Sequence, residues 1–129
     1  MSIAVLFDQA VRGNAALVAA AREALLRQQP LYVVHIVGGV DKPDDDSGVR
    51  AAAAALLADF EGLDWHLKLL PEGVDTAESV LRAADEFGAT LLVMGAKRRR
   101  AIGKLLLGST VQRLLLNSHI DVLVVRVPS

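Results

Sequence analysis

Short apolar runs alternate with longer amphipathic runs along the whole chain, and this alternation limits the folds that the chain can adopt. Five of the short runs have the length and composition of β-strands: residues 3–7, 31–37, 65–70, 90–94 and 122–127. Strands separated by helices predict a parallel sheet, because crossover connections return the chain to the same end of the sheet. We therefore expect an α/β fold, a three-layer sandwich with helices on both faces of a doubly wound, five-stranded parallel sheet.

Four amphipathic segments fill the gaps between the predicted strands. The first ends before Pro30, and the third opens with a capping box formed by Asp75 and Glu78 and ends at Gly88. The second contains five consecutive alanines, which favour a helix by propensity. The predicted helices cover residues 14–28, 49–60, 75–87 and 109–116.

The size and composition of the chain indicate one globular domain over residues 1–129. Hydrophobic residues make up 53% of the chain and charged residues 22%, a balance that argues against disorder. No apolar run approaches the roughly 18 residues that span a bilayer, and the N-terminus lacks the basic start of a signal peptide. Together with the absence of cysteine, this leads us to expect a cytoplasmic protein that does not bind membranes.

The stretch from Met94 to Thr110 has the composition of a phosphate-binding connection between a strand and a helix. It follows an apolar run, contains glycines and cations, and ends in Gly-Ser-Thr before an amphipathic segment. Free backbone N–H groups and the helix dipole favour an anion at such a place. Five of the fourteen cationic residues lie in this stretch, although the net charge is −1. This concentration suits a small anion and argues against nucleic acid as a partner.

The better-known phosphate and nucleophile motifs are absent from the sequence. Gly103 and Lys104 resemble part of a P-loop, but the motif requires glycine at Arg98 and serine or threonine at Leu105. There is no Gly-x-Gly for a dinucleotide fold and no Gly-x-Ser-x-Gly elbow. A phospho-acceptor receiver domain would require a carboxylate at the end of the third strand, and Glu72 after Pro71 is a poor match.

The order of several short motifs resembles the universal stress protein family over the full chain. Gly95-x2-Arg98-x9-Gly108-Ser109 is similar to the family's nucleotide signature, Gly-x2-Gly-x9-Gly-Ser/Thr. Asp8 follows the first strand, as in the family, and a Val-His-Ile triplet lies in the second strand. The resemblance implies a Rossmann-like sheet with strand order 3-2-1-4-5. The reversal of that order between the first and fourth strands creates a crevice where such sheets bind ligands.

The resemblance also implies an adenine-nucleotide site, with ATP or AMP as the ligand. Leu6, Phe7 and Asp8 would border the adenosine, and Ile36 would lie against the adenine, whose edge its backbone would read. The ribose and phosphates would then meet residues of the signature: Met94, Gly95, Gly108, Ser109, Thr110 and Val111. ATP would bring a magnesium ion with it, because phosphates supply most of that ion's ligands.

One position of the signature departs from the family pattern, because Arg98 replaces its second glycine. Either the Arg98 guanidinium grips phosphate oxygens, or its bulk prevents the close approach that glycine permits. The family's Asp-Gly-Ser is also Asp-Gln-Ala here, which removes a hydroxyl. These departures keep open a nucleotide-free interaction protein, in which Arg98 fills the phosphate site with a salt bridge to Asp8.

The remaining polar residues give little support for catalysis or for a metal site. His35 lies within an apolar strand and is expected to be buried and hydrogen-bonded. His66 and His119 have no cysteine or carboxylate at metal-ligand spacing, and the aspartates between residues 41 and 46 lack the spacing of a calcium loop. Without a general base beside a nucleophile, we expect no catalytic residue and no efficient enzyme. A slow ATP hydrolase or phosphotransferase, with Asp8 as a metal-bound carboxylate, is the third possibility.

The last predicted strand, Val122–Val127, is apolar and lies at one edge of the implied sheet. An exposed apolar edge promotes aggregation unless it is covered. Antiparallel pairing with the same strand of a second copy would cover it, and the family often dimerises in this way. We therefore expect a homodimeric stress-response or signalling module that binds an adenine nucleotide.

Overall fold

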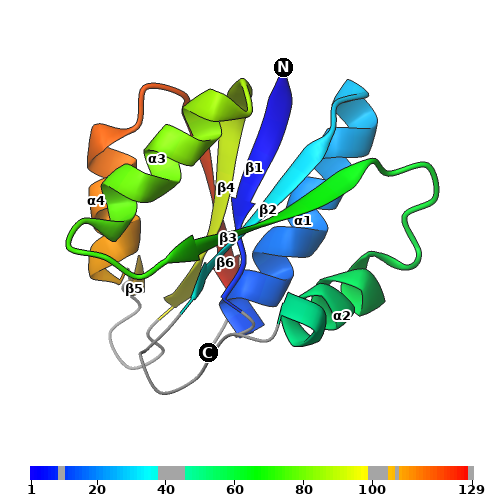
Figure 1. Cartoon of the computed structure of the whole chain (residues 1–129), viewed down its shortest axis with the longest axis horizontal. Coiled ribbons are helices and arrows are strands. Elements are labelled where there is room, and N and C mark those ends of the chain that lie inside the picture. Colours follow the sequence, from blue (N-terminus) through cyan, green and yellow to red (C-terminus); the bar gives the residue numbers. More distant parts are fainter. Residues whose placement is uncertain (9–10, 38–45, 99–104, 107, 128–129) are drawn as a thin grey trace.

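Five parallel strands form one twisted sheet in the computed structural model, which describes residues 1–8, 11–37, 46–98, 105–106 and 108–127 (Figure 1). Their order across the sheet is β3-β2-β1-β4-β6, so the predicted order is confirmed, with β6 as the fifth parallel strand. A short strand, β5 (Leu105–Leu106), pairs antiparallel with the end of β4. The parallel strands are β1 (Ser2–Leu6), β2 (Leu31–Val37), β3 (Trp65–Pro71), β4 (Ala89–Arg98) and β6 (Asp121–Val127).

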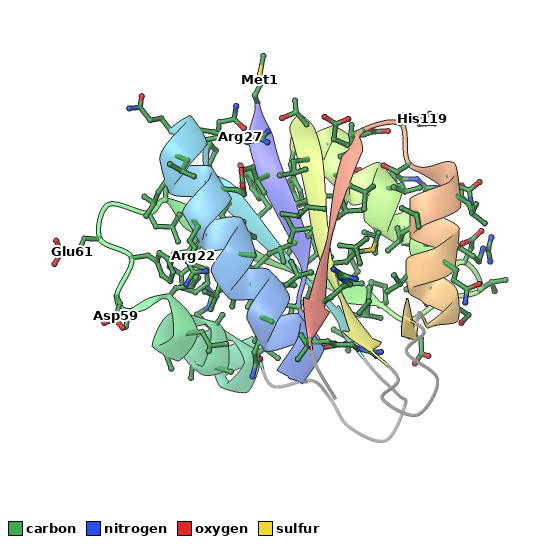
Figure 2. All side chains as sticks on the ribbon, turned by 180° about the vertical axis from the view of Figure 1, so that it is seen from behind. Met1, Arg22, Arg27, Asp59, Glu61 and His119 are labelled. Atoms are coloured by element: carbon green, nitrogen blue, oxygen red, sulfur yellow. The ribbon has the colours of Figure 1, made fainter. Side chains whose placement is uncertain are left out.

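Two helices cover each face of this sheet. On one face lie α1 (Val11–Arg27) and α2 (Asp46–Leu57), and on the other lie α3 (Thr76–Glu86) and α4 (Ser109–Asn117). The view from behind has α1 in front of the sheet, with charged side chains on its outer side (Figure 2). Among the described residues, no helix is long and apolar enough to cross a membrane.

The central strands are mainly apolar because each of their faces meets a separate core. In β1, Ile3 and Val5 pack toward α1 and α2, whereas Ala4 packs toward α3 and α4. All three side chains are fully buried. Alternation of neighbouring side chains between two buried faces is the reason that the strands read as continuous apolar runs.

The strand β4 differs most from the sequence prediction. The apolar run predicts an end at Met94, but the strand continues through Gly95 to Arg98. It continues because its backbone remains paired, with β6 up to Lys97 and with β5 at Lys97 and Arg98. The first part of the predicted phosphate loop is therefore a strand, and this is a correction of the sequence reading.

Other element ends differ by a few residues. The strand β1 ends at Leu6, one residue before the predicted end, and α2 begins at Asp46 rather than at Val49. The N-cap half of the predicted capping box of α3 is present, because the Asp75 carboxylate accepts a hydrogen bond from the Glu78 N–H at 3.0 Å, whereas the Glu78 carboxylate pairs with Arg82. Gly88, which was predicted to end this helix, has φ +67°, a conformation that favours glycine.

Candidate functional site

A cavity of about 330 Å³ lies at the carboxyl ends of β1 and β2, beside the N-termini of α3 and α4. Its position is the crevice at which parallel sheets of this kind bind ligands. Its volume is at the small end of the range for small-molecule pockets, about 300–1,000 Å³. The residues that line it are Leu6, Phe7, Asp8, Arg12, Ile36, Glu72, Thr76, Gly108, Ser109, Thr110 and Val111.

The end of β1 is fixed to β2 by two hydrogen bonds at Phe7. The Phe7 N–H donates to the Val34 carbonyl at 2.8 Å, and the Phe7 carbonyl accepts from His35 Nδ1 at 2.7 Å. Because a carbonyl only accepts, Nδ1 of His35 carries the proton. His35 is partly buried and hydrogen-bonded, so it has the structural role expected from the sequence, and it holds the backbone from which Asp8 projects.

Asp8 folds back over the first turn of α1. Its carboxylate forms an ion pair with Arg12 at 3.0 Å, and both side chains remain between one third and two fifths exposed. A Cβ on Gly13 would collide with the Asp8 carboxylate, so glycine provides the space for this arrangement. A carboxylate at a helix N-terminus is favoured by the helix dipole, and Asp8 therefore has a structural role in addition to lining the cavity.

The N-terminus of α4 offers donors to the cavity. Its N-cap is Gly108, which has no side chain to accept a hydrogen bond. The Gly108 carbonyl accepts from the Gln112 N–H at 3.0 Å, the first bond of the helix. Helix geometry leaves the N–H groups of Ser109, Thr110 and Val111 without a partner inside the helix. The dipole and these N–H groups together favour an anion here.

The N-terminus of α3 differs from that of α4, although both border the cavity. Asp75 caps α3 with its own carboxylate, and Glu78 adds a second negative charge in the first turn. These carboxylates already satisfy the dipole and one N–H group of α3. An anion in the cavity is therefore expected to bind at α4 rather than at α3.

Eight of the eleven predicted site residues line this cavity. Met94 and Gly95 are placed elsewhere, and the side chain of Arg98 is not described. Met94 is fully buried in the core under α3 and α4. Gly95 is buried against the backbone of α1, where a Cβ would collide with the Arg12 carbonyl oxygen. The backbone of Arg98 pairs with Leu105 in the sheet, and its side chain lies outside the part that the structure describes. The contacts predicted for these three residues stay predictions.

Three residues of the lining were not predicted from the sequence. Arg12 is four residues after Asp8, a spacing at which helical side chains meet. Glu72 directly follows β3, so the rule that strand ends share one edge of the sheet would have identified it. Thr76 is the first residue of α3 and follows its N-cap, but nothing in the sequence indicates that α3 begins beside the cavity.

Clustered metal ligands are absent from the described part of the chain. No group of three histidine, cysteine, aspartate or glutamate side chains lies close enough together there to hold a metal ion. The predicted cation-rich residues 99–104 and part of the acidic segment, residues 41–45, lie outside the described residues.

Comparison with known proteins gives consistent matches over nearly the whole chain. Residues 1–126 match the model of the universal stress protein family. A universal stress protein of Mycolicibacterium smegmatis is 39% identical over 117 residues, 88% of each chain. The solved structure of a universal stress protein from Archaeoglobus fulgidus is 29% identical, with a TM-score of 0.77 and coverage of 96% of this chain and 97% of that chain.

A further solved structure contains a ligand. It is a universal stress protein from Archaeoglobus fulgidus in complex with dAMP, 27% identical to this chain, with a TM-score of 0.70. The match covers 96% of both chains. The fold is thus that of a known family of α/β proteins.

Proposed function

This chain belongs to the universal stress protein family, and from that premise we propose that it binds an adenine nucleotide in the cavity between β1, β2 and α4. The observation that carries the proposal is the lining itself. The end of β1, Ile36 of β2 and the uncapped N-terminus of α4 all border one cavity of mononucleotide size. The dAMP complex of a similar protein supports the choice of an adenine nucleotide.

The two ends of the cavity suit the two ends of a nucleotide. Leu6 and Ile36 are partly buried apolar residues, which provide a surface for the adenine. The N–H groups of the first turn of α4, which have no partner inside the helix, and the hydroxyls of Ser109 and Thr110 provide donors for the phosphate. Asp8 follows β1 and lines the same cavity, where its partly exposed carboxylate would meet the ribose hydroxyls.

We infer that AMP-type nucleotides fit the described lining better than ATP. The charged residues of that lining are Asp8, Arg12 and Glu72. Asp8 and Arg12 already form an ion pair with each other. A volume of about 330 Å³ also suits one phosphate better than three. ATP with magnesium remains the ligand to compare with AMP in the experiment below.

We further propose that the protein is a homodimeric binding and signalling module rather than an efficient enzyme. The lining supplies groups that bind and orient, and among its described residues no side-chain base is hydrogen-bonded to the Ser109 or Thr110 hydroxyl. The position of β6 supports the dimer. This strand forms an edge of the described sheet, where it can pair with the same strand of a second copy.

Thermal unfolding with and without nucleotide tests the proposed site. A ligand at one hundred times its dissociation constant adds about 2.7 kcal/mol to the free energy of unfolding. For a chain of this size the midpoint should rise by roughly 10 °C. AMP, dAMP, ATP and ATP with magnesium are compared at millimolar concentration, and a midpoint that none of them raises would contradict nucleotide binding.

The variant Gly108→Asp separates binding from folding. A Cβ at Gly108 meets nothing within 4 Å, so a side chain fits there. An aspartate at this position can cap α4 by accepting from the same N–H groups that we propose bind the phosphate. We expect the free variant to be at least as stable as the wild type, whereas its midpoint no longer rises with AMP. Gly73→Asp adds the same charge at an exposed position with open space around it. This control should respond to AMP as the wild type does.

A further inference from the structure

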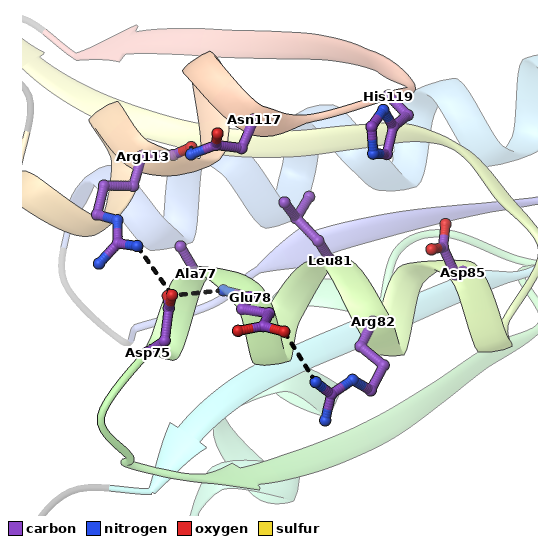
Figure 3. Close-up of a pocket in the computed structure, with 9 residues that line it drawn as sticks. All are labelled: Asp75, Ala77, Glu78, Leu81, Arg82, Asp85, Arg113, Asn117 and His119. Carbon is purple, nitrogen blue, oxygen red and sulfur yellow. Dashed lines mark hydrogen bonds and ion pairs between the residues drawn. The ribbon is translucent and has the colours of Figure 1, made fainter.

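We infer that the ion pair between Arg113 and Asp75 positions the N-terminus of α4 for the phosphate, an inference that rests on the proposed nucleotide function. Arg113 Nη2 donates to Asp75 Oδ2 at 2.8 Å and so joins α4 to the start of α3 (Figure 3). Neither residue lines the cavity proposed for the nucleotide. Arg113 is therefore a positioning residue and makes no contact with the ligand itself.

The Asp75 carboxylate is held from two directions. One oxygen, Oδ1, accepts the Glu78 N–H at 3.0 Å as the N-cap of α3, and the other accepts Arg113. The backbone carbonyl of Asp75 also accepts from the Ser79 N–H at 3.2 Å. Because the cap fixes the carboxylate on α3, the ion pair fixes the position of Arg113, and with it α4, relative to that cap.

The residues next to this ion pair are residues of the nucleotide cavity. Thr76, which follows Asp75 directly, lines the cavity. Val111, which lies two positions before Arg113 on α4, lines it as well. A helix is stiff over one turn because its backbone bonds connect each turn to the next. A shift of α4 at Arg113 therefore moves the N–H groups of Ser109 and Val111 that would meet the phosphate.

The ion pair lies outside an apolar contact between α3 and α4. Beneath it, Ala77, Val80, Val111 and Leu114 share one apolar core. Outside that core, a polar groove of about 480 Å³ separates the two helices, and Asp75 and Arg113 lie on its opposite walls. The groove also contains the ion pair between Arg82 and Glu78 at 3.0 Å, but both of these residues belong to α3. Arg82 is thus a natural control, since its pair joins no second helix.

The test compares AMP with adenosine, because only AMP uses the phosphate donors of α4. In Arg113→Ala we expect the dissociation constant for AMP to rise about two- to fivefold, which is the range expected for an exposed ion pair. The constant for adenosine should stay unchanged. Arg113→Lys should restore part of the AMP affinity, and Arg82→Ala should bind both ligands as the wild type does. Titration calorimetry measures all four proteins.

Two results would overturn the positioning role. One is that Arg113→Ala keeps the wild-type affinity for both AMP and adenosine; the other is that it loses both affinities by the same factor, which indicates general destabilisation. Asp75→Asn provides a second variant, because asparagine still caps α3 but carries no charge. It should reproduce the selective loss of AMP affinity.

A wild type that binds neither ligand would contradict the proposed function, and the positioning role is then tested without ligand. Amide chemical shifts of Ser109, Thr110 and Val111 are compared between Arg113→Ala and Arg82→Ala. Selective shifts at these three amides in Arg113→Ala support the positioning role. Spectra in which both variants match the wild type at these amides overturn it.

Discussion

Gly95 lies where the first turn of α1 crosses β4, and its missing side chain permits that crossing. A Cβ at this position would collide with the carbonyl oxygen of Arg12 and would lie 2.7 Å from its carbonyl carbon. Both groups belong to backbone, which cannot rotate away as the end of a side chain can. The glycine that begins the family signature therefore has a packing role in this chain, independent of any ligand.

Gly95→Ala is expected to destabilise the protein in the absence of nucleotide. Forcing a methyl group into a packed interior costs about 1–3 kcal/mol in the free energy of unfolding. Urea unfolding measures this loss as a lower midpoint with an unchanged slope. Gly73→Ala is the matched control, because a Cβ there meets nothing within 4 Å. Equal stability of the two variants would show that α1 does not constrain Gly95.

Residues of the candidate site can be predicted from the sequence where a motif and the sheet topology agree. They are harder to predict where a side chain pairs with a residue of another helix. Asp8, Ile36 and Gly108 follow from the family resemblance and from the rule that strand ends share one edge. Arg113 does not, because its pairing with Asp75 joins residues 38 positions apart in the sequence. No periodicity or motif encodes that distance, and only the packing of α3 on α4 brings the two charges together.

At the scale of secondary-structure elements, the sequence predicts the existence and order of helices and strands better than their ends. An apolar run in the sequence marks only the part of a strand whose side chains are apolar. The strand β4 continues past that point, since Lys97 and Arg98 pair through their backbones with neighbouring strands. Backbone pairing is independent of side-chain type, so the apolar pattern gives no signal for it.

The C-terminus of α1 is a second example of an end that the sequence indicates only in part. Pro30 predicts that the helix stops, but the turn itself is made by Gln28 with φ +55°. The Gln29 N–H donates to the Ala24 carbonyl at 3.0 Å and the Gln28 N–H to that of Leu25 at 3.3 Å. This is the Schellman pattern, in which glycine normally occupies the left-handed position.

Gln28→Gly should therefore stabilise the protein. Glycine avoids the clash that a side chain makes in the left-handed region, and this gain exceeds the cost of its greater freedom in the unfolded chain. We expect the free energy of unfolding to rise by about 0.5–1 kcal/mol, measured by urea unfolding. Gln28→Ala removes the same side chain but keeps a Cβ, so it should show no such rise. A gain of equal size in both variants would contradict the backbone explanation.

At the scale of the whole molecule, the two edges of the parallel sheet differ. The strand β3 alternates between partly buried and exposed side chains from Trp65 to Leu69, so one of its faces meets water. The strand β6 has four consecutive partly buried residues, Val122 to Val125, and pairs with β4 alone among the described strands. No described strand pairs with its other side, where backbone N–H and C=O groups lie next to apolar side chains. Such an edge favours pairing with the same strand of a second copy.

Hydrogen exchange along β6 distinguishes the dimer from the monomer, because successive amides of a strand point to opposite sides. In a monomer only the amides that bond to β4 are protected, so protection alternates along Asp121–Val127. In a dimer paired through β6 the outward amides are bonded as well, and protection becomes continuous. We expect continuous protection, together with a mass in ultracentrifugation of twice 13.7 kDa.

Dilution below the dissociation constant should restore the alternating pattern and the monomer mass together. Alternating protection in a sample that sediments as a dimer would place the interface on another surface, and a monomer mass at every concentration would exclude the dimer.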